Sequence, residues 1–401
     1  MKAKAFLFVL GFVLALGCDK SEDIPPFENV ELETAEAKAL VSQNNQFAIE
    51  FFRKVVENET EENYMVSPLS LSMALGMVHN GAHGDTKVAF DNLLGMGAPL
   101  DQLNQFNENL RKSLTTKVEG TDMNLANAIW IQEDFPVEDT FVEVNQKVYE
   151  AEVDNIDFRN PAATTIVNNW VERNTNGKIR ELVKEFTPGT RLFLANALYF
   201  KSQWKYRFKT ENTRNALFYS SPENAVEVPM MNMNAEVPFF VNETFRSIIL
   251  PYKKERFEML LLLPNYGLTT SDIMDIITGD NLDTWLKEYD LAELAIGVPK
   301  FEMEYENLLN DELKDLGLEI AFSANADLGG ISPGASLQIS RVLQKTFIEV
   351  NEEGTEAAAA TGVEVIETSA PPSFIADRPF LYLIRDGYTG SILFIGRIGL
   401  P

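Results

Sequence analysis

The sequence has few of the side chains that enzymes use for nucleophilic and metal chemistry. Its 401 residues include one cysteine and two histidines. His79 and His83 are four residues apart and could share a metal ion. However, Gly81 lies between them, and no third ligand follows at a fixed spacing. We therefore expect both histidines at the surface, near a helix end, and predict neither a metal nor a cofactor.

The motifs of the common hydrolases and nucleotide-binding proteins are also missing. We find no H-E-x-x-H, no G-x-S-x-G and no G-x-x-x-x-G-K-S/T. Acidic residues are abundant, so a glycosidase with paired carboxylates stays open, but no pair stands out. We predict that the protein is not an enzyme.

Basic side chains are scarce as well. Thirty-four Lys and Arg residues face 60 Asp and Glu residues, which gives a net charge of −26. Nucleic acids and anionic membrane surfaces bind basic patches. We therefore exclude both as partners. The net charge favours solubility and, weakly, basic partners.

The N-terminus is typical of an exported protein. Lys2 and Lys4 precede an apolar stretch, residues 5–17, which is too short to span a membrane. The only cysteine, Cys18, follows directly and resembles the lipidated residue of a bacterial lipoprotein. An ordinary secretory signal with an incidental cysteine is the alternative. We predict a signal peptide at 1–17, an acidic tether at 18–35 and a lipid anchor on Cys18 at the bacterial outer membrane, on either of its faces.

The rest of the chain, residues 36–401, reads as one α+β unit without a flexible linker. Helical periodicity and caps predict helices at 34–58, from Ser67-Pro68 onward and at 101–115. Two more are predicted within 164–182, stopping near Gly177, and within 307–322, ending near Gly317. Apolar runs predict strands at 124–132, 190–204, 246–252 and 257–265, a strand pair at 291–306 and a hairpin at 380–398. Helices dominate the first half and strands the second, which is not a βαβ pattern.

One segment near the C-terminus has no clear preference for helix or strand. Residues 351–372 read NEEGTEAAAATGVEVIETSAPP. Taken as a strand, alternate residues from Thr355 to Val365 are all small or β-branched, whereas the opposite face holds Glu356 and Glu364. Small uncharged side chains on one face suit a strand that must enter between two others. An exposed alanine-rich loop is the simpler interpretation.

This segment and several others resemble the serpin family. EEGTEAAAATG resembles the hinge of an inhibitory serpin, and NYMVSPLSLSMALGMVHNGAHGDT, LANALYFKSQW, AFSANADLGGIS and RPFLYLI follow in the family's order, from about residue 36 to 401. The resemblance implies three β-sheets, about nine helices and an exposed reactive loop at about 352–372. A target protease cleaves this loop, which then inserts into the central sheet. Serpin loop insertion is itself the standard example of such strand addition.

The resemblance also implies the position of the reactive bond. Family spacing from Glu352 and from Pro379 places it between Thr368 and Ser369, with the bonds after Ile366 or Glu367 as alternatives. The small residue suggests elastase-like or subtilisin-like serine proteases as targets, bound covalently as acyl complexes. The hinge residues implied are Glu352, Gly354, Thr355, Glu356, Ala357, Ala358, Ala359 and Ala360.

Further positions match the places where the family's central sheet opens. They are Ser67, Pro68, Ser70, Asn196, Trp204 and Gln344. Gln344 stands where the family often has histidine. The region 101–117, which binds heparin in some relatives, holds only three basic residues amid acids, and we predict no heparin binding and a monomer. Two alternatives stay open: a serpin that acts only as a substrate or binding protein, and, more remotely, a surface lipoprotein that binds or hydrolyses glycans.

Overall fold

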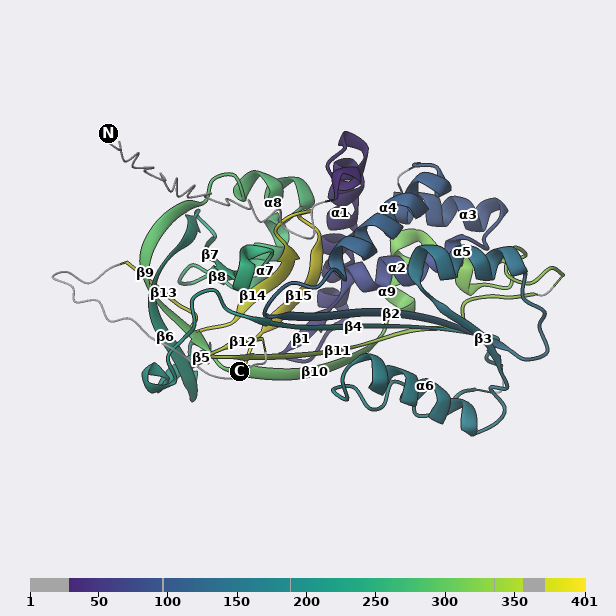
Figure 1. Cartoon of the computed structure of the whole chain (residues 1–401). Helices are drawn as coiled ribbons and strands as arrows, with labels where there is room; N and C mark the ends of the chain where they lie inside the picture. Colours follow the sequence, from purple (N-terminus) through teal and green to yellow (C-terminus); the bar gives the residue numbers. More distant parts are fainter. Residues whose placement is uncertain (1–28, 96, 188, 335, 356–371) are drawn as a thin grey trace, which may run out of the picture.

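The computed structural model describes residues 29–95, 97–187, 189–334, 336–355 and 372–401, which we call the described residues. They hold nine α-helices and fifteen strands in two hydrogen-bonded sheets, which confirms the α+β class (Figure 1). Cys18 and most of the loop segment, including Glu356, Ala357, Ala358, Ala359, Ala360, Thr368 and Ser369, lie outside them. No helix among the described residues has the length and apolar character that crossing a membrane requires.

Four helices begin near their predicted positions, at Ala35, Pro68, Leu100 and Ala162, whereas those that begin at Gly84, Asp139, Thr270 and Gly279 were not predicted. Thr34 caps the first helix by accepting a hydrogen bond from the amide of Ala37 at 3.1 Å. Ser67 caps the second, and Pro68 occupies its first position, where a missing N–H costs nothing. The helices are α1 (Ala35–Asn58), α2 (Pro68–His79), α3 (Gly84–Phe90), α4 (Leu100–Leu114), α5 (Asp139–Tyr149), α6 (Ala162–Asn174), α7 (Thr270–Ile276), α8 (Gly279–Trp285) and α9 (Asn310–Leu313).

The larger sheet has the order β1-β15-β14-β8-β7-β6-β9-β13, and β5 pairs with β6 outside this path. The long strand β6 joins what would otherwise be two sheets, because Phe239 pairs with both β9 and β7. The expected three sheets therefore appear as two connected networks. The strands are β1 (Tyr64–Val66), β5 (Arg214–Ser221), β6 (Asn224–Val241), β7 (Phe245–Pro251), β8 (Phe257–Pro264), β9 (Asp290–Pro299), β13 (Ser373–Ile375), β14 (Phe380–Asp386) and β15 (Ile392–Ile398).

The second sheet has the order β10-β11-β12-β4-β2-β3. Its longest pairing joins β2 and β4 over eleven residues, from Thr121↔Ser202 to Ile131↔Leu192. Only the two-residue strand β12 separates β11 from β4 at one end of the sheet. The strands are β2 (Thr121–Gln132), β3 (Glu152–Ile156), β4 (Leu192–Gln203), β10 (Phe301–Leu308), β11 (Arg341–Asn351) and β12 (Gly354–Thr355).

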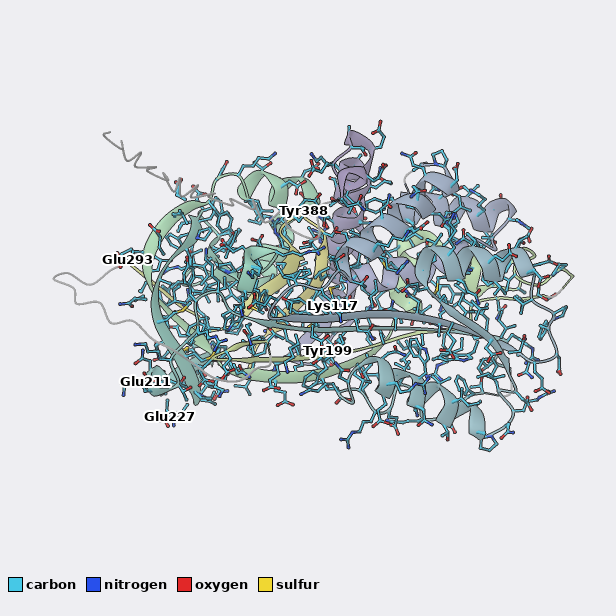
Figure 2. All side chains as sticks on the ribbon, in the orientation of Figure 1. Lys117, Tyr199, Glu211, Glu227, Glu293 and Tyr388 are labelled. Atoms are coloured by element: carbon cyan, nitrogen blue, oxygen red, sulfur yellow. The ribbon has the colours of Figure 1, made fainter. Side chains whose placement is uncertain are left out.

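Side chains fill the space between the sheets and the helices that cover them (Figure 2). All twelve residues of α2 are buried, and this helix contacts both β4 and β15. A helix that is apolar on every side belongs inside a core. The outer face of the second sheet carries α6 and a smaller core, in which Trp130 packs edge-on against Trp170 at 5.4 Å (Figure 1).

Three expectations need correction. The predicted strand pair at 291–306 is two strands, but β9 and β10 belong to different sheets, because the chain passes from one to the other at Lys300. The helix expected from 307 to an end near Gly317 is shorter than predicted: α9 is followed by π and 3-10 turns, while Gly317, with a φ of +98°, lies where the end was expected. His79 is fully buried against Phe90 rather than at the surface, since its α2 neighbours are all buried.

Candidate functional site

The predicted hinge is held between two strands of the second sheet. After β11, the chain turns at Glu352 and Glu353 and returns as β12. Thr355 pairs with Val350 of β11 and with Ser202 of β4, and both pairings are antiparallel. The side chain of Thr355 is buried, with 3% of its surface exposed. Gly354 and Thr355 of the predicted hinge are therefore part of the sheet.

Away from β12, the strands β4 and β11 run side by side and pair directly only at their N-terminal ends. Arg341 and Val342 of β11 pair in parallel with Phe193 and Leu194 of β4. Within these two fully described strands, no further β4–β11 pair follows between Leu194 and the β12 position. The two flanking strands are thus joined at one end directly and at the other end through the hinge.

Gly354 is required by the close approach of the hinge to β4. Its φ of +148° lies in the range that residues with a side chain rarely adopt. A Cβ atom at this position would lie 2.0 Å from the carbonyl oxygen of Ser202. Any larger residue would push β12 away from β4.

Glu352 anchors the turn before Gly354. Its carboxylate lies 2.9 Å from the Lys300 ammonium and accepts a hydrogen bond of 2.8 Å from the Thr213 hydroxyl. Burial alone would raise the pKa of Glu352, but these contacts outweigh it and lower the pKa below its ordinary value. Its carbonyl also accepts from the Phe208 amide at 3.0 Å. The hinge is therefore bonded through both side chain and backbone.

An aromatic pair supports the hinge from the side of β4. Trp204 and Tyr252 stack with ring centres 4.4 Å apart. The indole N–H of Trp204 donates to the Asn351 carbonyl at 3.0 Å, and its amide donates to the Glu353 carbonyl at 2.8 Å. The Tyr252 hydroxyl lies 2.8 Å from that of Thr355. Trp204 thus bonds the backbone on both sides of Glu352, next to β12.

The remaining predicted residues meet at the N-terminus of α2. On the β4 side, the Ser70 hydroxyl donates to the Asn196 amide oxygen, and Asn196 donates to Asn127 on β2 at 2.6 Å. On the β11 side, Gln344 accepts from the Ser67 amide at 2.8 Å and donates to the Ser67 carbonyl at 2.9 Å. One helix end therefore holds both strands that flank the unpaired stretch.

This arrangement separates Gln344 from Asn196. The glutamine satisfies both of its polar atoms on one residue, Ser67. None of the five side chains at this junction is a group that titrates near neutral pH. They are Ser67, Ser70, Asn127, Asn196 and Gln344.

Four contact residues escaped the sequence-based prediction: Asn127, Thr213, Tyr252 and Lys300. Tyr252 ends an apolar strand and Lys300 follows a proline. Both patterns are common at strand ends, so they did not mark either residue as part of a site. The bonded partners of the four residues in this site lie 52 to 139 positions away in the chain, from Lys300 with Glu352 to Thr213 with Glu352. Only the paired strands bring them together.

The other predicted groups do not form a site. His79 bonds Asp91 at 2.8 Å, whereas His83 lies 3.7 Å from Asp327. Burial lowers the pKa of His79 more than Asp91 raises it. Within the described ranges, no cluster of His, Cys, Asp or Glu could hold a metal ion. Arg111 lies in the region 101–117, for which we predict no heparin binding. Its side chain is buried and contacts Glu150 at 2.8 Å.

Comparison with known proteins agrees with this geometry. A family model described as Serpin (serine protease inhibitor) matches residues 42–401. A serpin-like protein of Thermococcus kodakarensis is 34% identical over 392 residues, which cover 96% of this chain and 91% of that protein.

Solved structures show the same fold. The thermophilic serpin tengpin in its native state has a TM-score of 0.85 and 28% identity, over 90% of this chain and 94% of tengpin. Human thyroxine-binding globulin complexed with its hormone has a TM-score of 0.85 and 28% identity, over 90% of this chain and 98% of the globulin. Since the family model covers nearly the whole described part, the chain belongs to the serpin family.

Proposed function

We propose that the protein is a suicide-substrate inhibitor of elastase-like or subtilisin-like serine proteases. The main support is that Thr355 pairs with both Val350 and Ser202. This pairing would align the loop with the unpaired stretch between β11 and β4. Insertion would extend a strand that has already begun. About 14 residues at roughly 3.3 Å each make a strand of about 45 Å, long enough to carry a bound protease across the molecule.

The chemistry of capture belongs to the protease. Its serine oxygen attacks the carbonyl carbon of Thr368, and the bond to the nitrogen of Ser369 breaks. The leaving amine takes a proton from the protease's histidine, and an ester joins Thr368 to the enzyme. Insertion then draws the ester away before water can hydrolyse it, so each inhibitor molecule acts once.

The existing register indicates which residues would meet after insertion. Both pairings of Thr355 are antiparallel, so each later loop residue meets an earlier residue on either neighbour. Six steps beyond Thr355, Thr361 would lie opposite Gln344 on β11 and Asn196 on β4. Thr355 points into the core, and alternation gives the same direction to Ala357, Ala359 and Thr361.

Insertion must also break a specific set of existing pairs. Eight steps beyond Thr355, Val363 would meet Val342 and Leu194 in the same register. These two residues are now paired with each other. The loop would therefore fill the unpaired stretch first, and would then have to separate β4 from β11 at Val342 and Arg341.

The proposal is tested by incubating the protein with elastase, subtilisin and trypsin, followed by denaturing gels. We expect a complex of summed mass with elastase or subtilisin and none with trypsin. Mass spectrometry should find a released C-terminal fragment that begins at Ser369. Fragments beginning at Glu367 or Thr368 would move the reactive bond to Ile366 or Glu367.

A paired variant tests insertion itself. Thr355→Arg places a charge where the side chain is buried, so the variant should be cleaved without forming a complex. Thr187→Arg, at an exposed loop residue, is the matched control and should inhibit normally. Undiminished inhibition by Thr355→Arg would refute the insertion mechanism.

A non-inhibitory serpin is the second candidate, supported by the likeness to thyroxine-binding globulin, whose structure was solved with thyroxine. Clean cleavage that leaves every protease active would favour it. The glycan-acting lipoprotein is the remote third candidate, and binding or hydrolysis of a glycan without protease inhibition would favour it.

We further propose that Cys18 carries a lipid that holds residues 36–401 at the outer membrane through the acidic tether, 18–35. The support is the pattern of the N-terminus alone. Growth with labelled palmitate should label the wild type and leave Cys18→Ser unlabelled; equal labelling would contradict the proposal. We also propose a monomer that binds neither heparin nor nucleic acid. The net charge of −26 disfavours nucleic acid, and the few basic residues at 101–117 disfavour heparin.

A further inference from the structure

A histidine is enclosed in the core at the C-terminal end of α2. His79 is the last residue of this wholly buried helix, and none of its side-chain surface is exposed. Its ring stacks on that of Phe90, with ring centres 5.5 Å apart. The chain has one other histidine, His83, and 59% of that side chain is exposed. The two histidines therefore meet opposite environments.

The hydrogen bonding of His79 suits its neutral form. Its Nε2 atom lies 2.8 Å from the carboxylate of Asp91, which only accepts, so this nitrogen carries the proton of the neutral ring. The Nδ1 atom is buried and has no hydrogen-bond partner among the described residues. A second proton, on Nδ1, would place an N–H group in the core without an acceptor. Burying a donor in this way is costly, and burial also disfavours the charged ring.

Two charged groups act on this ring, and they oppose each other. Asp91 favours a charged imidazole, whereas the ammonium of Lys87, from α3, disfavours one. Lys87 lies 2.8 and 2.7 Å from the two oxygens of Asp91, so the charge of this carboxylate is already balanced. The elements α1, α5, β2, β4 and β15 also pack against α2. Among their described residues, none adds a charge that acts on the ring. Burial therefore outweighs Asp91 and lowers the pKa of His79.

The other end of α2 holds the sheet that the loop would enter. Ser70 bonds Asn196 of β4, and Ser67 exchanges two hydrogen bonds with Gln344 of β11. The helix has twelve residues, so about 18 Å separates its two ends. Because every residue of α2 is buried in a close-packed core, its C-terminal end cannot leave that core without disturbing the packing along the helix.

We propose that His79 makes the opening of the second sheet sensitive to acid. The folded protein holds the neutral ring, whereas a form in which the end of α2 leaves the core exposes the ring and takes up a proton. Mild acid therefore favours such open forms, and through α2 it favours the separation of β4 from β11. The inference rests on the proposed function for its biological meaning, because loop insertion needs the same separation. Its test uses no protease, so the two can fail separately.

Guanidinium unfolding of the full chain at pH 7.5 and pH 5.5 tests the uptake of the proton. The unfolded histidine has a pKa of about 6.5, so a proton that only the unfolded chain binds raises the unfolding equilibrium constant up to about tenfold at pH 5.5. We expect this rise in the wild type and in His83→Gln, the exposed control, and a smaller rise in His79→Gln. Glutamine can still donate to Asp91 but does not titrate. An equal rise in His79→Gln would overturn the proposal.

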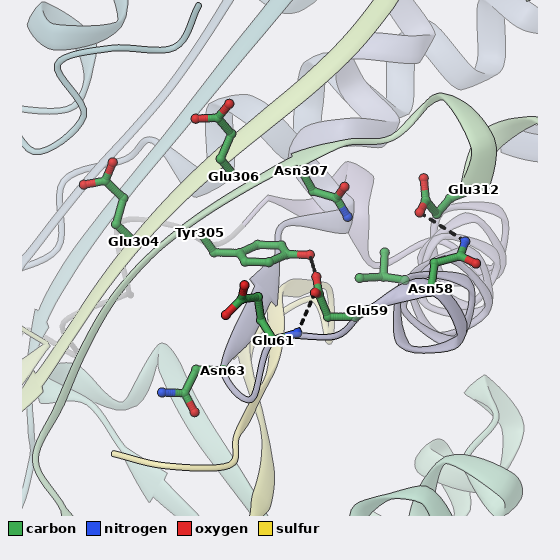
Figure 3. A pocket seen from close by; sticks show the side chains of 10 residues that line it. Asn58, Glu59, Glu61, Asn63, Glu304, Tyr305, Glu306, Asn307 and Glu312 are labelled. Carbon is green, nitrogen blue, oxygen red and sulfur yellow. Dashed lines mark hydrogen bonds between the residues drawn. The ribbon is translucent and has the colours of Figure 1, made fainter.

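Proton uptake at other groups cancels in this comparison. A polar pocket of about 500 Å³ at the end of α1 is lined by five glutamates (Figure 3). They are Glu59, Glu61, Glu304, Glu306 and Glu312. None of the described residues that line this pocket belongs to α2 or α3. Its response to acid should therefore be the same in the wild type and in both histidine variants.

Hydrogen exchange tests the coupling between the helix end and the sheet. The rates are measured at pH 7.5 and pH 5.5 for the amides of α2, β4 and β11, and are corrected for the direct effect of pH on exchange. We expect faster opening of all three elements at pH 5.5 in the wild type and in His83→Gln, and a weaker response in His79→Gln. Faster exchange in α2 alone, with β4 and β11 unchanged, would contradict the coupling.

A direct titration replaces the variant if His79→Gln fails to fold. Wild-type protein that is isotope-labelled only at histidine gives two imidazole signals in an NMR spectrum, and His83→Gln assigns them. The signal of His79 should stay that of a neutral ring from pH 7.5 to pH 5.5. A His79 signal that titrates in this range, in protein that remains folded, would overturn the proposal.

Discussion

The hydroxyls of Tyr252 and Thr355 lie 2.8 Å apart in the core, where β12 pairs with β4. Tyr252 stacks on Trp204, which in turn holds the backbone of Asn351 and Glu353. A connected set of side chains therefore encloses the described part of the hinge, and its bonds can be removed one at a time.

Tyr252→Phe removes only the hydroxyl and keeps the stacked ring. The buried Thr355 hydroxyl then loses its partner, and we expect the free energy of unfolding to fall by about 1–3 kcal/mol. Guanidinium unfolding measures the change. Tyr266→Phe, on a ring that is 75% exposed, is the control. Equal stability of the two variants would show that the Tyr252 hydroxyl contributes nothing.

Gly354→Ala should displace the hinge from β4. The new Cβ would lie 2.0 Å from the Ser202 carbonyl oxygen, and strained backbone of this kind costs about 1–3 kcal/mol. We expect a lower melting temperature and slower complex formation with the target protease. Gly189→Ala, where a Cβ meets nothing within 4 Å, should behave as the wild type. A Gly354→Ala protein that matches it would contradict the observed packing.

The Glu352–Lys300 pair predicts a dependence of stability on pH. The folded pKa of Glu352 is lowered, so its stabilising contribution is complete above the unfolded value of about 4.3 and is lost as the pH falls through the folded pKa. Glu352→Gln should therefore be less stable than wild type at pH 7, and the difference should shrink toward pH 3.

Melting temperatures of wild type and Glu352→Gln between pH 7 and pH 3 give the measurement. Glu223→Gln, at an exposed turn, serves as the control and should follow the wild type throughout. A stability difference for Glu352→Gln that stays constant over the range would mean that the carboxylate charge is not what anchors the hinge.

Gln344→Ala should loosen β11 from the start of α2. It leaves the buried amide and carbonyl of Ser67 without their side-chain partner, and we expect a loss of about 1–3 kcal/mol in urea unfolding. Gln338→Ala is exposed and should change little. Since no group at this junction titrates near neutral pH, the loss should be the same at pH 6 and pH 8; a change between them would contradict the assignment.

Local patterns predicted most of the elements. Apolar periodicity located α1, and a capping serine followed by proline located the start of α2. Continuous apolar runs located β4, β7 and β8. The resemblance to a family supplied the hinge and the residues near the sheet opening, and the structure places Ser67, Ser70, Asn196, Gln344 and Trp204 around the strands that flank the unpaired stretch.

Other features depended on contacts between distant segments. Apolar alternation looks alike in β9 and β10, so it could not reveal that the chain changes sheets at Lys300. His79 lies in a motif that reads as a helix end, and only packing against Phe90 buries it. The partners of Glu352 and Thr355 have no local signal, because they lie on strands far away in the chain.

The hinge depends both on local sequence and on contacts between distant segments. Small residues and a glycine after Glu353 are a property of the chain, because side-chain size and backbone freedom are set locally. Whether that segment rests in the sheet depends on Ser202, Val350 and Tyr252, which only the completed sheet brings to it. Hydrogen bonds act over about 3 Å, so residues more than a hundred positions apart, such as Tyr252 and Thr355, can bond only after folding.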